Sequence, residues 1–251
     1  NIFNTVYIAM NVLELFSGTG SVGKVCNQLG WDVVSVDMIL PATHKVDIML
    51  FDYKQYPKDY FGIIWQSPPC TNYSKLQDCW LGRMRKGELY TKEVQEREMN
   101  EDDKLVLKAL EIIEYFKPEW WFMENPAASR MKDRPFLRDT PNYVVDYCMY
   151  SDWGYRKRTR IWTNKKDWCA KVCDGSGSCG NMTDSHHTKV LGNGYDMIDG
   201  QKVLVNTKAK RLLHKTNLGN TERKQKTMGN GTSQQDRYRI PEDLILSLFL
   251  E

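Results

Sequence analysis

The sequence has no apolar run that approaches the roughly 18 to 20 residues needed to span a bilayer. Its N-terminus also lacks a basic segment followed by an apolar core and a cleavage site. These absences predict a soluble intracellular protein, cytoplasmic or nuclear, with no membrane partner. The cysteine spacing of small secreted domains is missing too, because seven cysteines are an odd number scattered over 251 residues. Reduced thiols are therefore expected rather than a disulfide framework.

The chain carries little net charge, +3 at pH 7, which alone does not indicate a nucleic-acid partner. The charge is unevenly distributed, however. Residues 163–226 contain 12 Lys and Arg against 6 Asp and Glu, a net charge of +6 that leaves −3 for the rest. The positive field is concentrated in the C-terminal third.

Short apolar runs alternate with helical patterns from Val12 to Trp162, which predicts an α/β domain with a largely parallel sheet. The expected strands are residues 12–16, 33–37, 62–66, 120–123, 143–148 and 160–163, and the expected helices are residues 21–29 and 102–116. A stretch rich in Gly, Asn, Ser, Thr and Lys then indicates a smaller second domain. The final "RYRIPEDLILSLFL" predicts a helix that returns to the first domain.

The segment "LELFSGTGSVGKV" places Gly18, Gly20 and Gly23 between the first strand and the first helix. Without side chains there, backbone amides can approach a ligand closely. Asp37, at the end of the next strand, is suited to accept hydrogen bonds from a ribose. A dinucleotide and S-adenosylmethionine would both use this layout, so the motif predicts a nucleoside ligand without choosing between them.

Three later segments carry chemically useful side chains. Cys70 ends "SPPC" after a buried strand, where two prolines stiffen the loop, and we interpret it as a nucleophile. Glu124 ends another strand in "FMENP" and is a candidate metal ligand, base or proton donor. In "GYRKRTRIW", Arg156, Arg158 and Arg160 alternate with a period of two, so an anionic ligand or carboxylates should face them.

In this order and spacing, the glycine motif, the acid after the second strand, Pro-Pro-Cys, Glu-Asn-Pro and the R-x-R strand resemble the DNA cytosine carbon-5 methyltransferases. The resemblance covers about residues 10–163 and the final helix, and is to the compact enzymes of phages, large DNA viruses and bacteria. It implies a Rossmann-like, S-adenosylmethionine-dependent catalytic domain at 10–163, a target-recognition insert at 164–235, and a C-terminal helix at 236–251. Double-stranded DNA is the implied partner, and we expect a monomer.

The resemblance also implies a role for each matching catalytic residue. Cys70 matches the nucleophile that adds to carbon 6 of cytosine, and Glu124 the acid that holds ring nitrogen 3 and the exocyclic amine. Arg160 would contact the 2-carbonyl oxygen of the base. Arg158 would orient the Cys70 loop and Glu124, and Asn125 would brace that loop.

For the methyl donor, the resemblance implies a set of contacts along the first part of the chain. Phe16, Gly18 and Gly20 match the first motif, Asp37 the ribose-binding acid, Met38 the residue against adenine, and Asp47 the residue that caps the adenine amine. Arg156 and Thr71 stand where the family has glutamines, and "MGNG" around Asn230 only partly matches the last motif.

Two polar segments have further expected roles. The stretch between Ser74 and Asn100 contains Arg83, Arg85 and Lys86, and the resemblance implies that it closes over a flipped base. Within the basic insert, three cysteines and two histidines follow a C-x3-C-x5-C-x6-H-H spacing, and three or four of them are candidate ligands of a structural zinc ion: Cys169, Cys173, Cys179, His186 and His187.

Three alternatives compete with DNA methylation. A tRNA cytosine methyltransferase shares the same chemistry. An amino-group methyltransferase is disfavoured, because its Pro-Pro motif ends in an aromatic residue where this chain has Cys70. An inactive DNA-binding regulator on the same fold would be expected to lose Cys70 or Glu124, and both are present.

Overall fold

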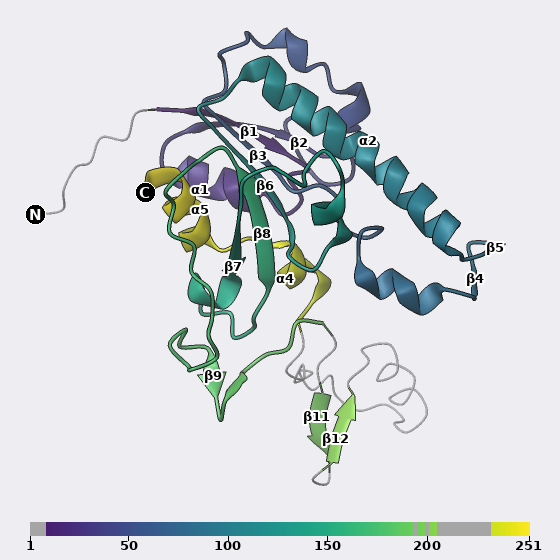
Figure 1. Ribbon diagram of the computed structural model, residues 1–251. Coiled ribbons are helices and arrows are strands. Elements are labelled where there is room, and N and C mark those ends of the chain that lie inside the picture. Colours follow the sequence, from purple (N-terminus) through teal and green to yellow (C-terminus); the bar gives the residue numbers. More distant parts are fainter. Residues whose placement is uncertain (1–8, 193–194, 199–200, 205–231) are drawn as a thin grey trace, which may run out of the picture.

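A six-stranded sheet lies at the centre of the protein (Figure 1). In this computed structural model, which describes residues 9–192, 195–198, 201–204 and 232–251, the strand order is β2-β1-β3-β6-β8-β7. The first four strands in that order pair in parallel, and β8 runs antiparallel to both of its neighbours. The predicted Rossmann-like α/β fold with a largely parallel sheet is confirmed.

The strands of this sheet are β1 (Asn11–Leu15), β2 (Asp32–Val36), β3 (Ile63–Gln66), β6 (Trp120–Pro126), β7 (Asn142–Asp146) and β8 (Arg158–Thr163). Three two-stranded ribbons add β4 (Met84–Arg85), β5 (Glu88–Leu89), β9 (Met182–Thr183), β10 (His186–His187), β11 (Tyr195–Ile198) and β12 (Gln201–Leu204). The described helices are α1 (Ser21–Gln28), α2 (Lys92–Phe116), α4 (Gln234–Tyr238) and α5 (Glu242–Leu250). Short 3-10 helices are η1 (Ile48–Leu50), η2 (Tyr53–Gln55), η3 (Lys75–Trp80), η4 (Arg130–Asp133) and η5 (Tyr147–Met149).

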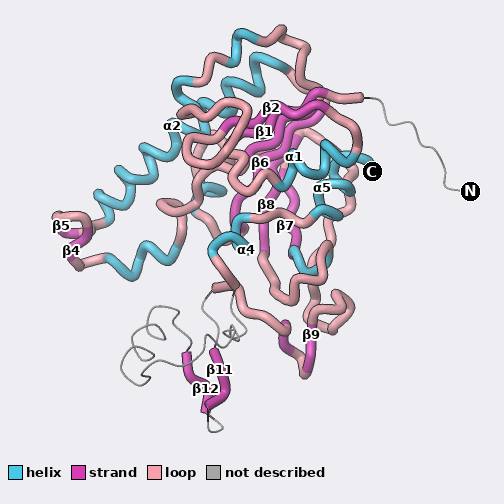
Figure 2. Tube along the Cα trace, turned by 180° about the vertical axis from the view of Figure 1, so that it is seen from behind, coloured by secondary structure: helices cyan, strands magenta, loops and turns pink. Residues whose placement is uncertain are grey.

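Helices cover the two faces of the sheet as separate layers, α2 on one and α1 with α5 on the other (Figures 1 and 2). Successive side chains of β1 point to opposite faces of the sheet, so they pack against both helical layers. Val12 packs in the cluster that contains Phe249 of α5, whereas Leu13 and Leu15 pack in the cluster that contains Phe116 of α2. Burial on both faces explains why β1 does not alternate regularly between apolar and polar residues.

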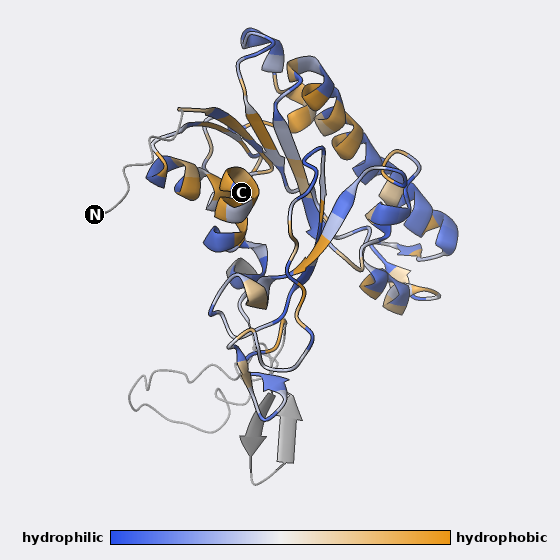
Figure 3. Cartoon of the chain, turned by 60° about the vertical axis from the view of Figure 1, so that its left-hand side comes forward, coloured by the Kyte–Doolittle hydropathy of each residue, from blue (hydrophilic) through white to orange (hydrophobic). Residues whose placement is uncertain are grey.

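Helix α2 begins at Lys92, ten residues before the predicted start, and the prediction was wrong there. Its first turns are mostly charged, so no apolar periodicity marks them (Figure 3). Polar contacts hold this part instead: the Thr91 side chain caps the helix, and Arg134 pairs with Glu96 at 2.7 Å and donates to Asp103. The helix ends at Phe116, as predicted, and Lys117 then takes a left-handed conformation before Pro118.

The stretch between Ser74 and Asn100 is an ordered excursion. It contains η3, the β4–β5 hairpin and the first turns of α2. Glu98 on α2 pairs with Arg85 at 2.6 Å and with Lys86 at 3.0 Å, which ties the hairpin to the helix. Two of the three basic side chains expected to face a flipped base are thus ion-paired in this structure.

The beginning of the predicted insert is built into the catalytic body. Trp168 lies in the core cluster of α1 and α5, and its indole donates to Ser247 at 2.9 Å. Lys165 donates to the carbonyl of Leu248 at 2.8 Å. The C-terminal helix α5 is therefore held both by the sheet and by residues just after β8. Asn230, at the partial match to the last motif, lies outside the described residues.

Across the described ranges, none of the helices combines the length and the apolarity that crossing a bilayer would take.

Candidate active site

The carboxyl ends of β3 and β6 lie side by side, because the two strands pair in parallel with Gln66 opposite Met123. The Ser67–Cys70 loop continues from β3, and Glu124 follows Met123 within β6. Asn125 then donates its side-chain amide to the carbonyl of Pro68 at 3.0 Å. The structure brings together the loop that carries Cys70 and the strand that carries Glu124, as expected for ends of neighbouring parallel strands.

Glu124 is buried, with 7% of its surface exposed. Its Oε1 accepts hydrogen bonds from the Tyr147 hydroxyl at 2.9 Å and from Lys157 Nζ at 3.2 Å. The Lys157 ammonium also lies 4.7 Å above the centre of the Tyr147 ring. In the part of the chain that is described, Oε2 takes no hydrogen bond, so one carboxylate oxygen is left for a ligand.

The Cys70 thiol is half-buried beside this carboxylate. Burial, followed by the negative charge of Glu124, raises the pKa of Cys70 above its ordinary value, and Lys157 acts in the opposite direction. Cys70 therefore rests as the thiol. Among its neighbours, the Lys157 cation does most to stabilise the thiolate.

Arg158 and Arg160 lie on the other side of β8 from this carboxylate. Residues opposite each other in an antiparallel pair share a face, and Glu124 is opposite Ile161 whereas Asn125 is opposite Arg160. Arg158 donates to Asp146 at 2.8 Å, and Arg160 donates to the side chain of Asn142. The structure therefore does not bring these two arginines to Glu124.

The predicted row of arginines does face a carboxylate. Asp146 is fully buried and pairs with Arg158 at 2.8 Å and with Arg156 at 3.0 Å. These bonds hold the pKa of Asp146 below its ordinary value despite burial. One of the two interpretations left open for the arginines, carboxylates rather than an anionic ligand, is confirmed for Arg156 and Arg158.

Sequence reasoning missed Lys157 and Tyr147. The same period of two that aligns the three arginines also turns Lys157 to the opposite face of β8, so the alternation contained the signal. Tyr147 had no such signal, because it follows β7 and is 23 residues from Glu124 in the chain.

The glycine motif forms a tight turn between β1 and α1. Phe16, Gly18 and Gly20 all have positive φ angles, of 55°, 52° and 65°. A positive φ is strained for Phe16, which indicates a conformation imposed by the surroundings. A Cβ atom added at Gly20 would meet nothing within 4 Å, so open space lies in front of the turn.

The acids predicted to hold the nucleoside lie next to this turn and shape its loops. Asp37 accepts from the amide of Gly18 at 2.9 Å and from the amide of Leu40 at 2.7 Å. Asp47 caps η1 by accepting from the amide of Met49 at 2.9 Å. The side chain of Met38 is also available to a ligand, because 60% of the residue's surface is exposed.

Glu14 is a further residue of this site that the sequence analysis overlooked. It lies on β1, is 3% exposed, and accepts from the amides of Val22 and Gly23 at 3.2 and 3.1 Å. Burial raises the pKa of Glu14 to about 7, while these two amides oppose the shift. A Cβ on Gly23 would lie 3.1 Å from this carboxylate, which accounts for the third glycine of the motif.

Unpartnered polar atoms gather where β1 and β3 end. The Ser17 hydroxyl and both polar atoms of the Gln66 side chain are buried without a hydrogen bond within the described structure. Buried polar groups are nearly always satisfied, so a ligand at this edge would complete them. Together with the open space at Gly20, they make the turn a fitting nucleoside site.

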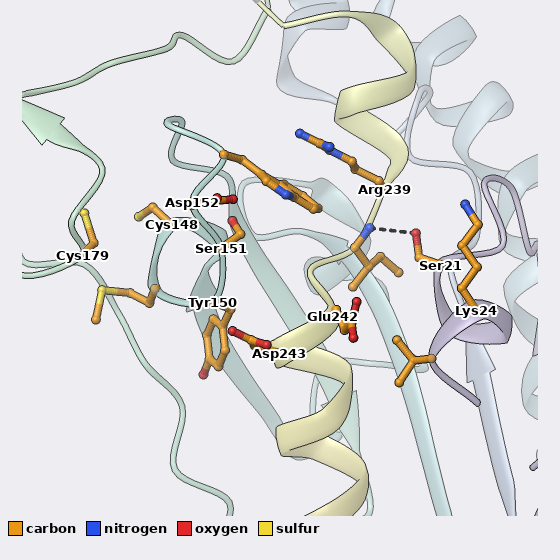
Figure 4. Close-up of a pocket in the computed structure, with 14 residues that line it drawn as sticks. Ser21, Lys24, Cys148, Tyr150, Ser151, Asp152, Cys179, Arg239, Glu242 and Asp243 are labelled. Carbon is orange, nitrogen blue, oxygen red and sulfur yellow. Dashed lines mark hydrogen bonds between the residues drawn. The ribbon is translucent and has the colours of Figure 1, made fainter. Parts of the chain in front are cut away.

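A separate hollow of about 550 Å³ lies between α1 and α5 (Figure 4). Ser21 and Arg239 line it, and Arg239 stacks 3.7 Å above the Trp153 ring. Neither Cys70 nor Asp37 is among its lining residues, so it is distinct from the candidate active site.

No protein-family model matches the chain. The chain is 38% identical over 243 residues to the "Probable DNA (cytosine-5)-methyltransferase" of Frog virus 3 (isolate Goorha), which covers 95% of this chain and 98% of the relative. Two solved structures are similar at lower levels. The Entamoeba histolytica methyltransferase EhMeth is 12% identical with a TM-score of 0.46, over 66% of this chain and 56% of that one. The S. pombe Dnmt2 methyltransferase is 13% identical with a TM-score of 0.40, over 70% of this chain and 56% of that one.

Proposed function

The chain belongs to the DNA (cytosine-5)-methyltransferase family, and we propose that it transfers a methyl group from S-adenosylmethionine to carbon 5 of a cytosine flipped out of duplex DNA. The observation that carries this proposal is the position of Cys70 and Glu124 at adjoining strand ends, tied together by Asn125. A nucleophile and a buried carboxylate in one place are what this reaction requires.

Carbon 5 of cytosine is a poor nucleophile, so the ring must first be activated. In the proposed reaction, the Cys70 thiolate forms a bond to carbon 6, and the displaced electron pair makes carbon 5 able to attack a methyl group. S-adenosylmethionine, when bound, supplies that methyl group as an electrophile. Transfer of the carbon 5 proton to solvent water would then re-form the double bond between carbons 5 and 6 and expel Cys70 as a thiolate, and the spent methyl donor would leave as S-adenosylhomocysteine.

Glu124 is proposed to hold ring nitrogen 3 and the exocyclic amine through Oε2, since its Oε1 is taken by Tyr147 and Lys157. Negative charge develops on the ring as Cys70 adds, and a proton delivered by Glu124 to nitrogen 3 would offset it. Lys157 favours the Cys70 thiolate by its positive charge, and it pairs with the Glu124 carboxylate at 3.2 Å. Lys157 thus contacts Glu124, the residue that the resemblance implied Arg158 would orient.

The arginines of β8 keep narrower proposed roles. Arg160 reaches the 2-carbonyl oxygen of the base only if it exchanges its present partner, Asn142. Arg158 is proposed to act indirectly, by fixing Asp146 and so the β7–β8 pair that carries Tyr147 and Lys157.

The methyl donor is proposed to lie against the glycine turn. The open space at Gly20, the unpartnered Ser17 hydroxyl and the unpartnered Gln66 side chain support this position. Asp37 would hold the ribose hydroxyls and Asp47 the adenine amine. Phe16 and Gly18 set the shape of the turn, and Met38 offers an exposed apolar surface for the adenine.

Duplex DNA is proposed as the substrate because the charge of +6 in residues 163–226 follows directly after the catalytic strands. A target base inside a duplex must be extruded before Cys70 can reach carbon 6. The basic stretch would hold the phosphates on either side of the extruded base, as a target-recognition domain at 164–235 would.

The test replaces Cys70 with serine and follows methyl transfer to duplex DNA by single-turnover assay. We expect Cys70→Ser to abolish transfer and covalent trapping on DNA that contains 5-fluorocytosine, while S-adenosylmethionine binding is kept. Cys79→Ser is the matched control, since Cys79 is an exposed thiol on the nearby η3 and should leave the rate unchanged. Transfer by Cys70→Ser at the wild-type rate would refute the mechanism.

The substrate class is tested by offering duplex DNA and tRNA together in equal amounts. Preferential methylation of the duplex is expected, and bisulfite sequencing of the product would give the target sequence. Exclusive methylation of tRNA would show that the same chemistry serves the other nucleic acid.

A further inference from the structure

Three thiols and one imidazole converge just beyond the end of β7. Cys148 lies on η5, Cys173 and Cys179 follow in the loop after β8, and His187 lies on β10. Their four ligand atoms all lie within 4.8 Å of one another. Cys148 and Cys173 are buried, whereas Cys179 and His187 are half-buried.

Two distances within this cluster are close to those of a tetrahedral metal site. The Nε2 atom of His187 lies 3.8 Å from the sulfur of Cys173 and 3.6 Å from that of Cys179. Zinc bonds of about 2.3 Å to sulfur and about 2.1 Å to nitrogen at tetrahedral angles give a ligand separation of about 3.6 Å. The remaining pairs need to close by about 1 Å at most to reach that arrangement.

We propose that Cys148, Cys173, Cys179 and His187 bind a structural zinc ion. Three thiolates and one imidazole form a complete set of four ligands, which is the composition of structural rather than catalytic zinc sites. Thiolate-rich sets also favour zinc over magnesium or calcium, which prefer oxygen ligands. The proposal concerns the architecture of the protein and does not depend on the methyl transfer proposed above.

The ligand set differs from the one that spacing predicted. Cys169 is exposed and lies outside the cluster. His186 is exposed, and its ring contacts the backbone carbonyl of Asp184 instead. Cys148 is the fourth ligand instead. It lies on η5, 25 residues before Cys173 and before β8 in the chain.

A buried amide holds the ligand-bearing segments together. Asn181 is 5% exposed, and its Nδ2 donates to the carbonyl of Cys148 and to the carbonyl of Cys179, both at 2.9 Å. Its Oδ1 accepts from the amide of Gly154 at 2.7 Å. These bonds position the backbone of two ligands before any metal arrives, as polar neighbours of metal sites commonly do.

The position of the cluster indicates what the zinc does. Cys148 belongs to the catalytic body, and the other three ligands belong to the start of the basic stretch, where the β9–β10 hairpin extends from the sheet (Figure 1). Figure 4 shows Cys148 and Cys179 on neighbouring segments beside the hollow between α1 and α5. Apolar burial is sparse along residues 174–192, so a metal would fix this hairpin to the catalytic body where a core does not.

The experiment measures zinc in the untagged, full-length protein by inductively coupled plasma mass spectrometry after dialysis. We expect one zinc ion per chain in the wild type, and its loss in Cys148→Ser and Cys173→Ser. Cys169→Ser and His186→Ala are the matched controls, since both residues lie next to the cluster in sequence and outside it in space; both should keep full zinc.

A cobalt spectrum covers the case in which the serine variants do not fold. Wild-type protein reconstituted with Co²⁺ should show strong tetrahedral d–d bands and thiolate charge-transfer absorption from three cysteines. Metal-free wild type in the presence of added zinc, a disulfide between any two of the three cysteines, or equal zinc loss in Cys169→Ser would each overturn the proposal. Neither the zinc measurement nor the cobalt spectrum uses DNA or S-adenosylmethionine. The outcome of this test is therefore independent of whether the protein transfers methyl groups.

Discussion

Glu14 allows a quantitative test of how the glycine turn is held. Its carboxyl is buried on β1 and serves the amides at the start of α1, and its pKa lies at about 7 instead of the ordinary 4.5. Between these two values the folded protein keeps a proton that the unfolded chain has released. The free energy of unfolding must therefore fall as the pH rises from about 4.5 to about 7, and stay low above that range.

The size of the effect follows from the same two values. Each unit between the folded and unfolded pKa of Glu14 corresponds to about 1.4 kcal/mol, so ionising this buried group costs the folded state about 3 kcal/mol at alkaline pH. Most of that cost, about 2.5 kcal/mol, is incurred between pH 5 and pH 8.5. Glu14→Gln keeps an acceptor for one of the two amides but does not titrate.

The assay is urea denaturation of wild type and Glu14→Gln at pH 5 and at pH 8.5, followed by tryptophan fluorescence. We expect the stability of the variant relative to wild type to increase by about 2.5 kcal/mol between the two pH values. Glu114→Gln is the control: its side chain is 81% exposed, and its difference from wild type should be the same at both pH values. A pH-independent difference for Glu14→Gln would refute the reasoning.

Three further predictions concern the catalytic strands. Asn125→Ala removes the amide that holds the Pro68 carbonyl, and should lower the single-turnover rate about 10²-fold without changing the dissociation constant of S-adenosylmethionine; an equal loss in both would contradict a bracing role. Asp146→Asn leaves the half-exposed Arg158 without its carboxylate, and should lower the free energy of unfolding by about 2 kcal/mol in urea; an unchanged midpoint would contradict it. Alkylation of Cys70, measured by peptide mass spectrometry, should accelerate about tenfold per pH unit from about pH 7 to pH 9, because burial raises the pKa of the thiol, and a plateau below pH 9 would contradict this.

The strands and the edge that carries the site were predictable because each depends on a local pattern. Apolar runs mark β1, β3 and β6, and parallel strands present their carboxyl ends at one edge of a sheet. Cys70 and Glu124 follow two such runs, so their proximity was implied by chain order. The start of α2 was not predictable, since its first ten residues are mostly charged and are held by an ion pair with a residue distant in the chain.

The partners of each side chain depended on tertiary structure. Whether Lys157 or Arg158 meets Glu124 depends on the register of β8 against β6, and a shift of one residue would exchange their faces. In the same way, spacing alone suggested Cys169 as a zinc ligand. Only the fold brings Cys148 to the cluster.

The sequence alone determined the family and the fold class, and it predicted Cys70 and Glu124 as the proposed nucleophile and acid, because these features are encoded in residues close together in the chain or at the ends of consecutive parallel strands. The tertiary structure decided which cation lies beside Glu124, which carboxylate neutralises the arginines, and which four ligands lie close enough for zinc. These contacts join residues up to 39 positions apart in the chain, the separation of Cys148 and His187, and strand register and packing, rather than local spacing, select among the possible partners.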